Sequence, residues 1–125
     1  MENLNEELYL SFRNEIEKIC TPEILKEVTT IKIIEDDKQV GIMCYIRQDG
    51  FVYVDAIYIK PEYRRSGIAR NTVLNWYEDF KDTEIRLHIV KKNHPAYKFW
   101  NSIFRLETIE ETFLDVLYKV KGLVN

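Results

Sequence analysis

The residues best suited to chemistry lie in one short loop near the middle of the chain. Three arginines, Arg64, Arg65 and Arg70, surround Gly67, with Ser66 beside it. Gly67 lacks a Cβ, so the backbone can approach an anion closely. Arginine side chains form charge-assisted bonds to phosphate, and Ser66 is a candidate helix cap. We therefore expect this loop to bind a phosphate or a pyrophosphate.

The elements on either side place this loop at the start of a helix. Residues 51–59 are rich in aromatic and β-branched types without a breaker, which predicts a strand. From about residue 67 to 80, apolar residues recur at helical spacing. The first turn of a helix offers unpaired N–H groups and the positive end of the helix dipole, and both favour an anion. A plain strand–turn–helix connection is the alternative.

Periodicity predicts the remaining elements. We expect an amphipathic helix at about 4–20 and a short one at about 22–26, strands at 29–34, 39–47, 84–90, 105–109 and 112–120, and a helix at 93–104. The strands at 29–34, 39–47 and 51–59 should form an antiparallel meander, because polar turns separate them. The fold class is therefore α/β in the broad sense, or α+β.

Length and charge limit the function classes. The 125 residues suffice for one domain and not for two. A formal net charge of −3 gives no reason to expect nucleic acid or an anionic membrane as a partner. Cys20 and Cys44 form neither a metal-ligand spacing nor a disulfide framework, so we expect buried free thiols and no metal.

The chain also lacks the patterns of export and of membrane insertion. Its N-terminus is acidic and does not show the basic and apolar regions of a signal peptide. Its apolar runs are shorter than the ~20 residues that a membrane-spanning helix needs. We therefore expect a cytoplasmic protein.

The loop and its flanks resemble a known signature. Arg64-x-x-Gly67-x-Ala69, preceded by Ile57-x-Ile59-x-Pro61-x-Tyr63, is similar to the acetyl-coenzyme A signature of the GNAT superfamily of N-acetyltransferases. The order of elements resembles a GNAT domain without its usual first strand. The resemblance implies a single GNAT-like domain over residues 1–125, with a mixed, mostly antiparallel central sheet flanked by helices.

The resemblance also implies a cofactor and where it binds. Acetyl-coenzyme A would be the co-substrate, with its diphosphate on the main-chain amides from about 65 to 70. Its pantetheine arm would enter where the strands at 51–59 and 84–90 run parallel and splay apart. The first motif thus assigns these residues to cofactor binding: Ile57, Ile59, Arg64, Arg65, Ser66, Gly67, Ile68, Ala69 and Arg70.

A second segment, Asn93-x-x-Ala96-x-x-Phe99-Trp100 after the strand at 84–90, resembles the family's second cofactor motif. Asn93 would hold the pantetheine or cap the helix, and Ala96 would leave room for the cofactor. Phe99 and Trp100 would line the wall, with core packing as the alternative for each.

The family usually has a tyrosine at the position of Trp100, thought to return a proton to the leaving thiolate. An indole N–H has no usable acidity near neutral pH. Tyr97, one turn earlier on the helix, is the candidate to supply a hydroxyl.

The strand at 51–59 is the expected place for the chemistry. The family's base is commonly a glutamate at the position of Tyr53, and Asp55, two residues on and on the same face, is the nearest carboxylate. We predict Asp55 as the base or as a group that positions water. The alternative is an aspartate with a structural hydrogen bond or salt bridge. A bulge near Ile57 would aim an N–H at the thioester carbonyl. His88 and His94 are weaker candidates for catalysis.

These residues favour an N-acetyltransferase that transfers an acetyl group directly from acetyl-coenzyme A to a primary amine of a small molecule or peptide. A non-catalytic, regulatory acyl-coenzyme A binding module is the alternative, because Trp100 replaces the usual tyrosine. Nucleic-acid binding would rest only on the arginines of the loop and is disfavoured by the net charge. The acceptor wall is thin in so short a chain, so a homodimer is a further hypothesis.

Overall fold

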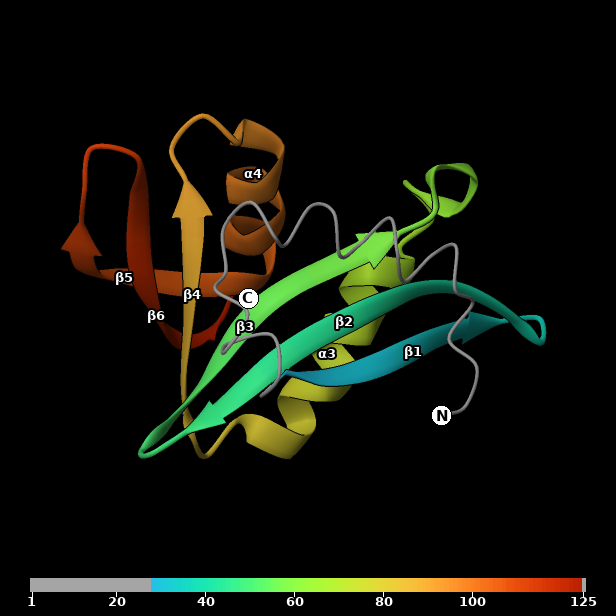
Figure 1. Ribbon diagram of the computed structural model, residues 1–125, viewed down its shortest axis with the longest axis horizontal. Helices are drawn as coiled ribbons and strands as arrows, with labels where there is room; N and C mark the ends of the chain where they lie inside the picture. Colours follow the sequence, from blue (N-terminus) through green and yellow to red (C-terminus); the bar gives the residue numbers. More distant parts are fainter. Residues whose placement is uncertain (1–27, 125) are drawn as a thin grey trace. The chain divides into compact units, whose positions relative to one another are not determined.

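The computed structural model describes residues 28–124, and the two predicted N-terminal helices lie outside that range. Six strands form one sheet in the order β1-β2-β3-β4-β6-β5 (Figure 1). The described residues fall into two compact units. The first contains residues 28–46 and Asp55–Thr72, and the second contains Arg47–Val54 and residues 73–124. This mixed α+β fold is the predicted class.

The first unit is built on a hairpin. β1 (Thr29–Glu35) pairs antiparallel with β2 (Lys38–Gln48), and the turn between them holds Asp36 and Asp37 at φ 50° and 64°. Positive φ at two consecutive residues suits a tight hairpin turn, and aspartate tolerates it better than most residues. β3 (Phe51–Ile59) follows, and its residues 55–59 belong to this unit. The antiparallel meander is as predicted (Figure 1).

β2 and the end of β3 approach each other unusually closely in this unit. A Cβ added at Gly41 would meet the carbonyl oxygen of Tyr58 at 2.3 Å and a side-chain carbon of Ile59 at 2.9 Å. The amide of Lys60 donates to the carbonyl of Val40 at 2.8 Å. The carboxyl end of β3 is therefore seated against a residue that has no side chain.

The second unit holds the rest of the sheet. Residues 51–54 of β3 pair in parallel with β4 (Glu84–Val90), which pairs antiparallel with β6 (Asp115–Leu123). β6 also pairs antiparallel with the outer strand β5 (Phe104–Glu111). The core of this unit comprises Val52, Val54, Val73, Trp76, Phe80, Ile85, Leu87, Ile89, Trp100, Ile103, Phe104 and Val116, all buried.

Two helices are described. α3 (Ile68–Phe80) begins in the first unit and ends in the second, where Trp76 stacks on Phe80 with ring centroids 4.7 Å apart. α4 (His94–Ile103) lies entirely in the second unit and leads directly into β5. Among the described helices, none is long and apolar enough to cross a bilayer.

The bounds of β3 and β4 match the prediction, whereas the last two strands differ. β5 runs from Phe104 to Glu111, and β6 begins at Asp115 rather than at Thr112. The hydroxyl of Thr112 accepts bonds from the amides of Leu114 and Asp115 at 3.2 and 3.1 Å. This local network holds a turn, so its β-branched and apolar residues do not extend the strand.

Candidate cofactor and active site

The loop after β3 is held by its own backbone. A short 3-10 turn, Pro61–Tyr63, begins with proline at its first position. The amides of Tyr63 and Arg64 donate to the carbonyls of Lys60 and Pro61 at 2.9 and 3.2 Å. The loop thus reaches the next helix in a defined conformation.

Ser66 does not cap that helix, contrary to our prediction. Its hydroxyl donates to the carbonyl of Tyr63 at 2.6 Å, back into the loop. The amide of Asn71 donates to the carbonyl of Gly67 at 3.0 Å, which makes Gly67 the N-cap residue of α3. Ser66 therefore lies one residue before the N-cap and stabilises the loop that leads into the helix.

The backbone at the start of α3 has the geometry of an anion site. Arg65 and Gly67 both have positive φ, 65° and 85°. Alternation of left- and right-handed residues turns successive N–H groups toward one point. Within residues 28–124, no hydrogen bond is recorded for the amides of residues 65 to 69. A Cβ built on Gly67 would meet nothing within 4 Å, so this side of the loop is open.

The arginines of the loop have different placements. The Nε of Arg64 donates to the carbonyl of Ile59 at 2.7 Å, and its guanidinium lies 5.3 Å from the ring centre of Tyr58. This bond uses one of the five guanidinium donors. Arg64 therefore ties the loop to the end of β3, and all three arginines are exposed.

The start of α4 is satisfied by the chain itself. The side-chain oxygen of Asn93 accepts from the amide of Ala96 at 3.1 Å, and its carbonyl accepts from the amide of Tyr97 at 3.1 Å. Asn93 is therefore an N-cap, which is one of the two roles the sequence left open. Ala96 is half-buried and Tyr97 is 44% exposed.

Trp100 belongs to the core of the second unit. It is 7% exposed, its indole is stacked 6.1 Å from the ring of Phe104, and the half-buried Phe99 meets it edge-on at 4.9 Å. Core packing, the alternative considered for these aromatics, accounts for the burial of Trp100.

Asp55 is half-buried on β3, in the first unit. It lies close enough to Cys44 for its charge to act on the thiol. Burial raises the pKa of the Cys44 thiol to about 12; the hydrogen bond with Thr30 opposes this shift and the Asp55 carboxylate adds to it. Cys44 is a buried free thiol, as predicted, and at this pKa it is no nucleophile.

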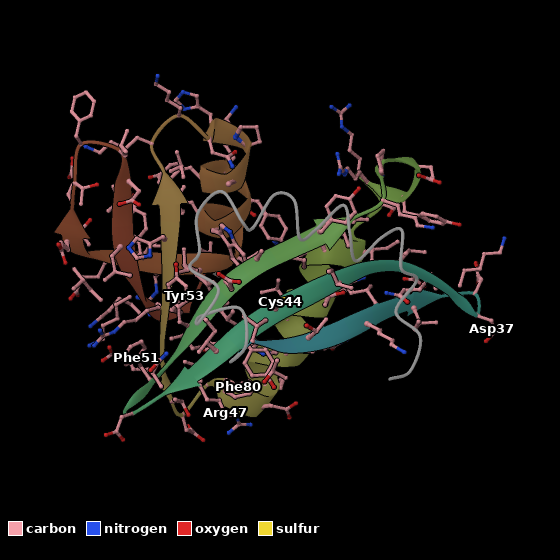
Figure 2. All side chains as sticks on the ribbon, viewed as in Figure 1. Asp37, Cys44, Arg47, Phe51, Tyr53 and Phe80 are labelled. Carbon is pink, nitrogen blue, oxygen red and sulfur yellow. The ribbon has the colours of Figure 1, made fainter. Side chains whose placement is uncertain are left out.

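The parallel register of β3 and β4 joins Phe51–Val54 to Glu84–Leu87. Ile57 is half-buried and Ile59 is 7% exposed on the part of β3 that follows this register. Sequence reasoning missed one pairing on these strands: the hydroxyl of Tyr53 lies 2.7 Å from Nδ1 of His88. Figure 2 labels Tyr53 on β3. Only the strand register could have revealed this contact.

The described residues contain no group of three or more histidine, cysteine or carboxylate side chains that could hold a metal ion. The site therefore consists of a glycine loop, the arginines around it, and a mixed sheet whose third and fourth strands run parallel; the loop amides have no hydrogen-bond acceptor within the part of the chain that the structure describes.

A family model supplies the identification. The model described as "Acetyltransferase (GNAT) family" matches residues 1–104, and this chain belongs to that family. Acyl transfer is the general activity that this membership supports. A search of curated proteins gives no match.

Solved structures agree on the fold. An acetyltransferase of Bacillus subtilis in complex with coenzyme A superposes with a TM-score of 0.70 at 16% identity, covering 96% of this chain and 94% of that one. An Elizabethkingia anophelis GNAT acetyltransferase with acetyl-coenzyme A bound gives 0.69 at 13% identity, covering 94% and 90%. The PaiA N-acetyltransferase of Thermoplasma acidophilum with coenzyme A gives 0.65 at 16% identity, covering 89% and 86%.

Proposed function

We propose that this protein is an N-acetyltransferase that moves an acetyl group from acetyl-coenzyme A to a primary amine of a small molecule or peptide by direct transfer. The chain would act as a single domain over residues 1–125, without a metal and in the cytoplasm. The residues that would bind the acceptor carry no recognisable motif, so only the chemical class of the acceptor is specified.

The observation that carries the proposal is the start of α3. Among residues 28–124, nothing accepts a hydrogen bond from the amides of residues 65 to 69, and a Cβ on Gly67 would meet nothing within 4 Å. A helix N-terminus favours a diphosphate because the N–H groups point outward and the dipole is positive there. Arg64, Arg65 and Arg70 would add charge, and Ile57 and Ile59 would contact the pantetheine arm.

Further residues are assigned to the cofactor wall and to the chemistry. We assign Ala96 and Phe99 to the cofactor wall, with Trp100 supporting it from the core. Tyr97 is the candidate for a hydroxyl that returns a proton to the thiolate. Asp55, in the first unit, is the carboxylate candidate for base or water-positioning group.

Calorimetry and a thiol-release assay test this proposal together. Coenzyme A at 100 times its Kd should stabilise the protein by about 2.7 kcal/mol. Acetyl-coenzyme A with a panel of primary amines should release free thiol at a rate that depends on the amine. No binding of coenzyme A would end the proposal.

A regulatory acyl-coenzyme A binding module remains a second candidate. Trp100 favours it, because a buried indole stands where the family has an acidic phenol. Binding of coenzyme A without turnover of any amine in the panel would support this reading. A homodimer stays a prediction, to be checked by light scattering of the eluting protein.

A further inference from the structure

Tyr53 and His88 form a hydrogen-bonded pair within the second unit. Their Oη and Nδ1 atoms are 2.7 Å apart, and the rings meet edge-to-face with centroids 5.5 Å apart at 64°. Tyr53 is half-buried and His88 is exposed, so the pair is open to solvent on the histidine side. A phenol bonded to an imidazole is a route along which a proton can move.

The strand register explains the pairing. Tyr53 is the partner of Arg86, and the next pair, Val54 with Leu87, is buried in the core. Since side chains alternate along a strand, Tyr53 and His88 lie on the opposite face, with His88 two residues beyond Arg86. The tyrosine therefore leans diagonally toward the carboxyl end of β4.

The other charges on β4 are engaged elsewhere. The carboxylate of Glu84 binds Arg86, and Lys119 of β6 lies 3.4 Å from it. The Arg86 guanidinium also lies 4.0 Å from the ring centre of Phe51. The bond to Arg86 foremost, and then Lys119, lower the pKa of the Glu84 carboxyl against the opposing effect of burial, so Glu84 stays ionised and paired.

On β6 the residue opposite His88 is Leu117, which is apolar. Asp115 and Lys119 lie two residues to either side of it along that strand. Asp115 accepts from the hydroxyl of Thr112 at 2.9 Å, and Lys119 faces Glu84. The charged groups around His88 on β4 and β6 thus all have partners of their own, and Tyr53 is the side chain bonded to its ring.

We propose that Tyr53 and His88 are the proton relay that makes the acceptor amine reactive, with Tyr53 touching the amine and His88 storing the proton. The inference rests on the proposed function and names the base for it. Alkyl amines have a pKa near 10, so the acceptor arrives as an ammonium ion that cannot attack. Histidine is the side chain that ordinarily exchanges a proton near neutral pH.

The proton steps balance as follows. The ammonium gives a proton to Oη of Tyr53 while the tyrosine gives its own to Nδ1 of His88, leaving a neutral amine and an imidazolium. The amine nitrogen bonds to the acetyl carbon and the carbon–sulfur bond breaks. The Tyr97 hydroxyl gives its proton to the departing thiolate and regains one from the nitrogen, which yields an amide and free thiol. The imidazolium then loses its proton to water.

Four variants test the relay with the amine that the wild type turns over fastest in a panel. His88→Gln and Tyr53→Phe should each lower kcat by about 100-fold at pH 7, the contribution of a general base, with the Kd of coenzyme A unchanged. The double variant should be no worse than either single one, because the two residues act as a unit. His94→Gln, at the chain's other histidine, should keep the wild-type rate.

Two further readouts separate a relay from a structural bond. At pH 9.5 more of the amine is neutral, so the deficit of His88→Gln should shrink by about tenfold or more. Methoxyamine, a nitrogen nucleophile that is neutral at pH 7, should show a smaller deficit at pH 7 than the alkyl amine does. Nitrogen NMR should show Nδ1 of His88 without a proton in the wild type and a shifted signal in Tyr53→Phe.

The outcomes are distinguishable from failure of the proposed function. If coenzyme A does not bind, or the wild type turns over no amine, the proposed function fails and the relay falls with it. If the wild type acetylates an amine and His88→Gln and Tyr53→Phe keep that rate, the relay alone is overturned. A protonated Nδ1 in the wild type, or a loss of rate confined to Asp55→Asn, also overturns it.

Discussion

The starts of α3 and α4 follow the same plan and differ in what satisfies them. Each follows a strand of the sheet and a loop that carries a basic pair, Arg64-Arg65 before α3 and Lys91-Lys92 before α4. At α4, the oxygen of Asn93 takes the amide of Ala96. At α3, the N-cap is Gly67, which has no side chain with which to cap.

This difference shows how backbone amides without a capping side chain can form a binding site. A helix start that caps itself is stable alone and has fewer free N–H groups to offer a ligand. A helix whose N-cap is glycine has no capping side chain, so its first amides stay available to a ligand. Lys91 also pairs with Glu111 at 2.6 Å, whereas the described residues include no ion-pair partner for Arg65. The comparison predicts that α3 binds an anion and that α4 does not.

The largest effect should come from Gly67→Ala, compared with Gly50→Ala as a matched control. Both glycines have positive φ, 85° and 87°, and open space at the Cβ position. Both changes should cost about 1–2 kcal/mol of folding stability, because an L-residue is strained at positive φ. Only Gly67→Ala should weaken coenzyme A binding, by about 10- to 100-fold, as one or two bonds to charged oxygens are lost.

Pantetheine, which lacks the diphosphate, sharpens the same comparison. Its Kd, measured by calorimetry, should be about the same for the wild type and Gly67→Ala, because the affected bonds are to phosphate oxygens. A similar loss of affinity for pantetheine and coenzyme A would mean that Gly67 acts on another part of the cofactor.

A smaller effect is expected from Arg64. Arg64→Ala should raise the Kd of coenzyme A by about tenfold, since the side chain both carries charge and fixes the loop to the carbonyl of Ile59. Arg64→Lys should recover only part of this, because lysine lacks the planar fork that reaches a carbonyl and a stacked ring together. Equal affinity of Arg64→Lys and the wild type would show that charge alone matters.

Asn93 separates the two roles that the sequence left open. Asn93→Ala should lower stability by about 1 kcal/mol through loss of the cap, and Asn93→Asp should keep it, because aspartate caps as well as asparagine. Coenzyme A should bind both variants as it binds the wild type. Weaker binding by Asn93→Asp at unchanged melting temperature would instead mean that the amide nitrogen holds the cofactor.

The smallest effect concerns salt. Raising the ionic strength from about 0.1 to about 1 M shortens the Debye length from about 10 to about 3 Å. The Kd of coenzyme A should rise about two- to fivefold, because the exposed arginines lose long-range attraction while the amides keep their bonds. Arg65→Gln should show less salt dependence than the wild type, as measured by calorimetry at both ionic strengths.

Much of the fold could be read from the sequence where pattern and breakers agree. Residues 51–59 and 84–90 have strong β-propensity between clear turns, and both strands match their predicted bounds. Thr112 misled the prediction because its hydroxyl bonds the following amides instead of leaving the backbone to the sheet. A side-chain bond of that kind is invisible to periodicity.

The candidate site was predictable only in part. Gly67 and the arginines stand out by type and spacing, and the structure gives them the expected loop before a helix. Ser66 was assigned the wrong partner, because a hydroxyl can donate back into the loop as readily as it can cap. The Tyr53–His88 pair depends on strand register, which one sequence does not reveal.

Gly41 lies far from the loop in sequence, yet its missing side chain sets where the loop begins. A methyl group there would collide with the main chain of Tyr58. The collision would displace the neighbouring carbonyl of Ile59, which accepts the hydrogen bond from Arg64. A random-mutagenesis screen for lost cofactor affinity should thus recover substitutions at position 41. Their effect on affinity would be indirect, through the position of the loop, and not through a contact with the ligand.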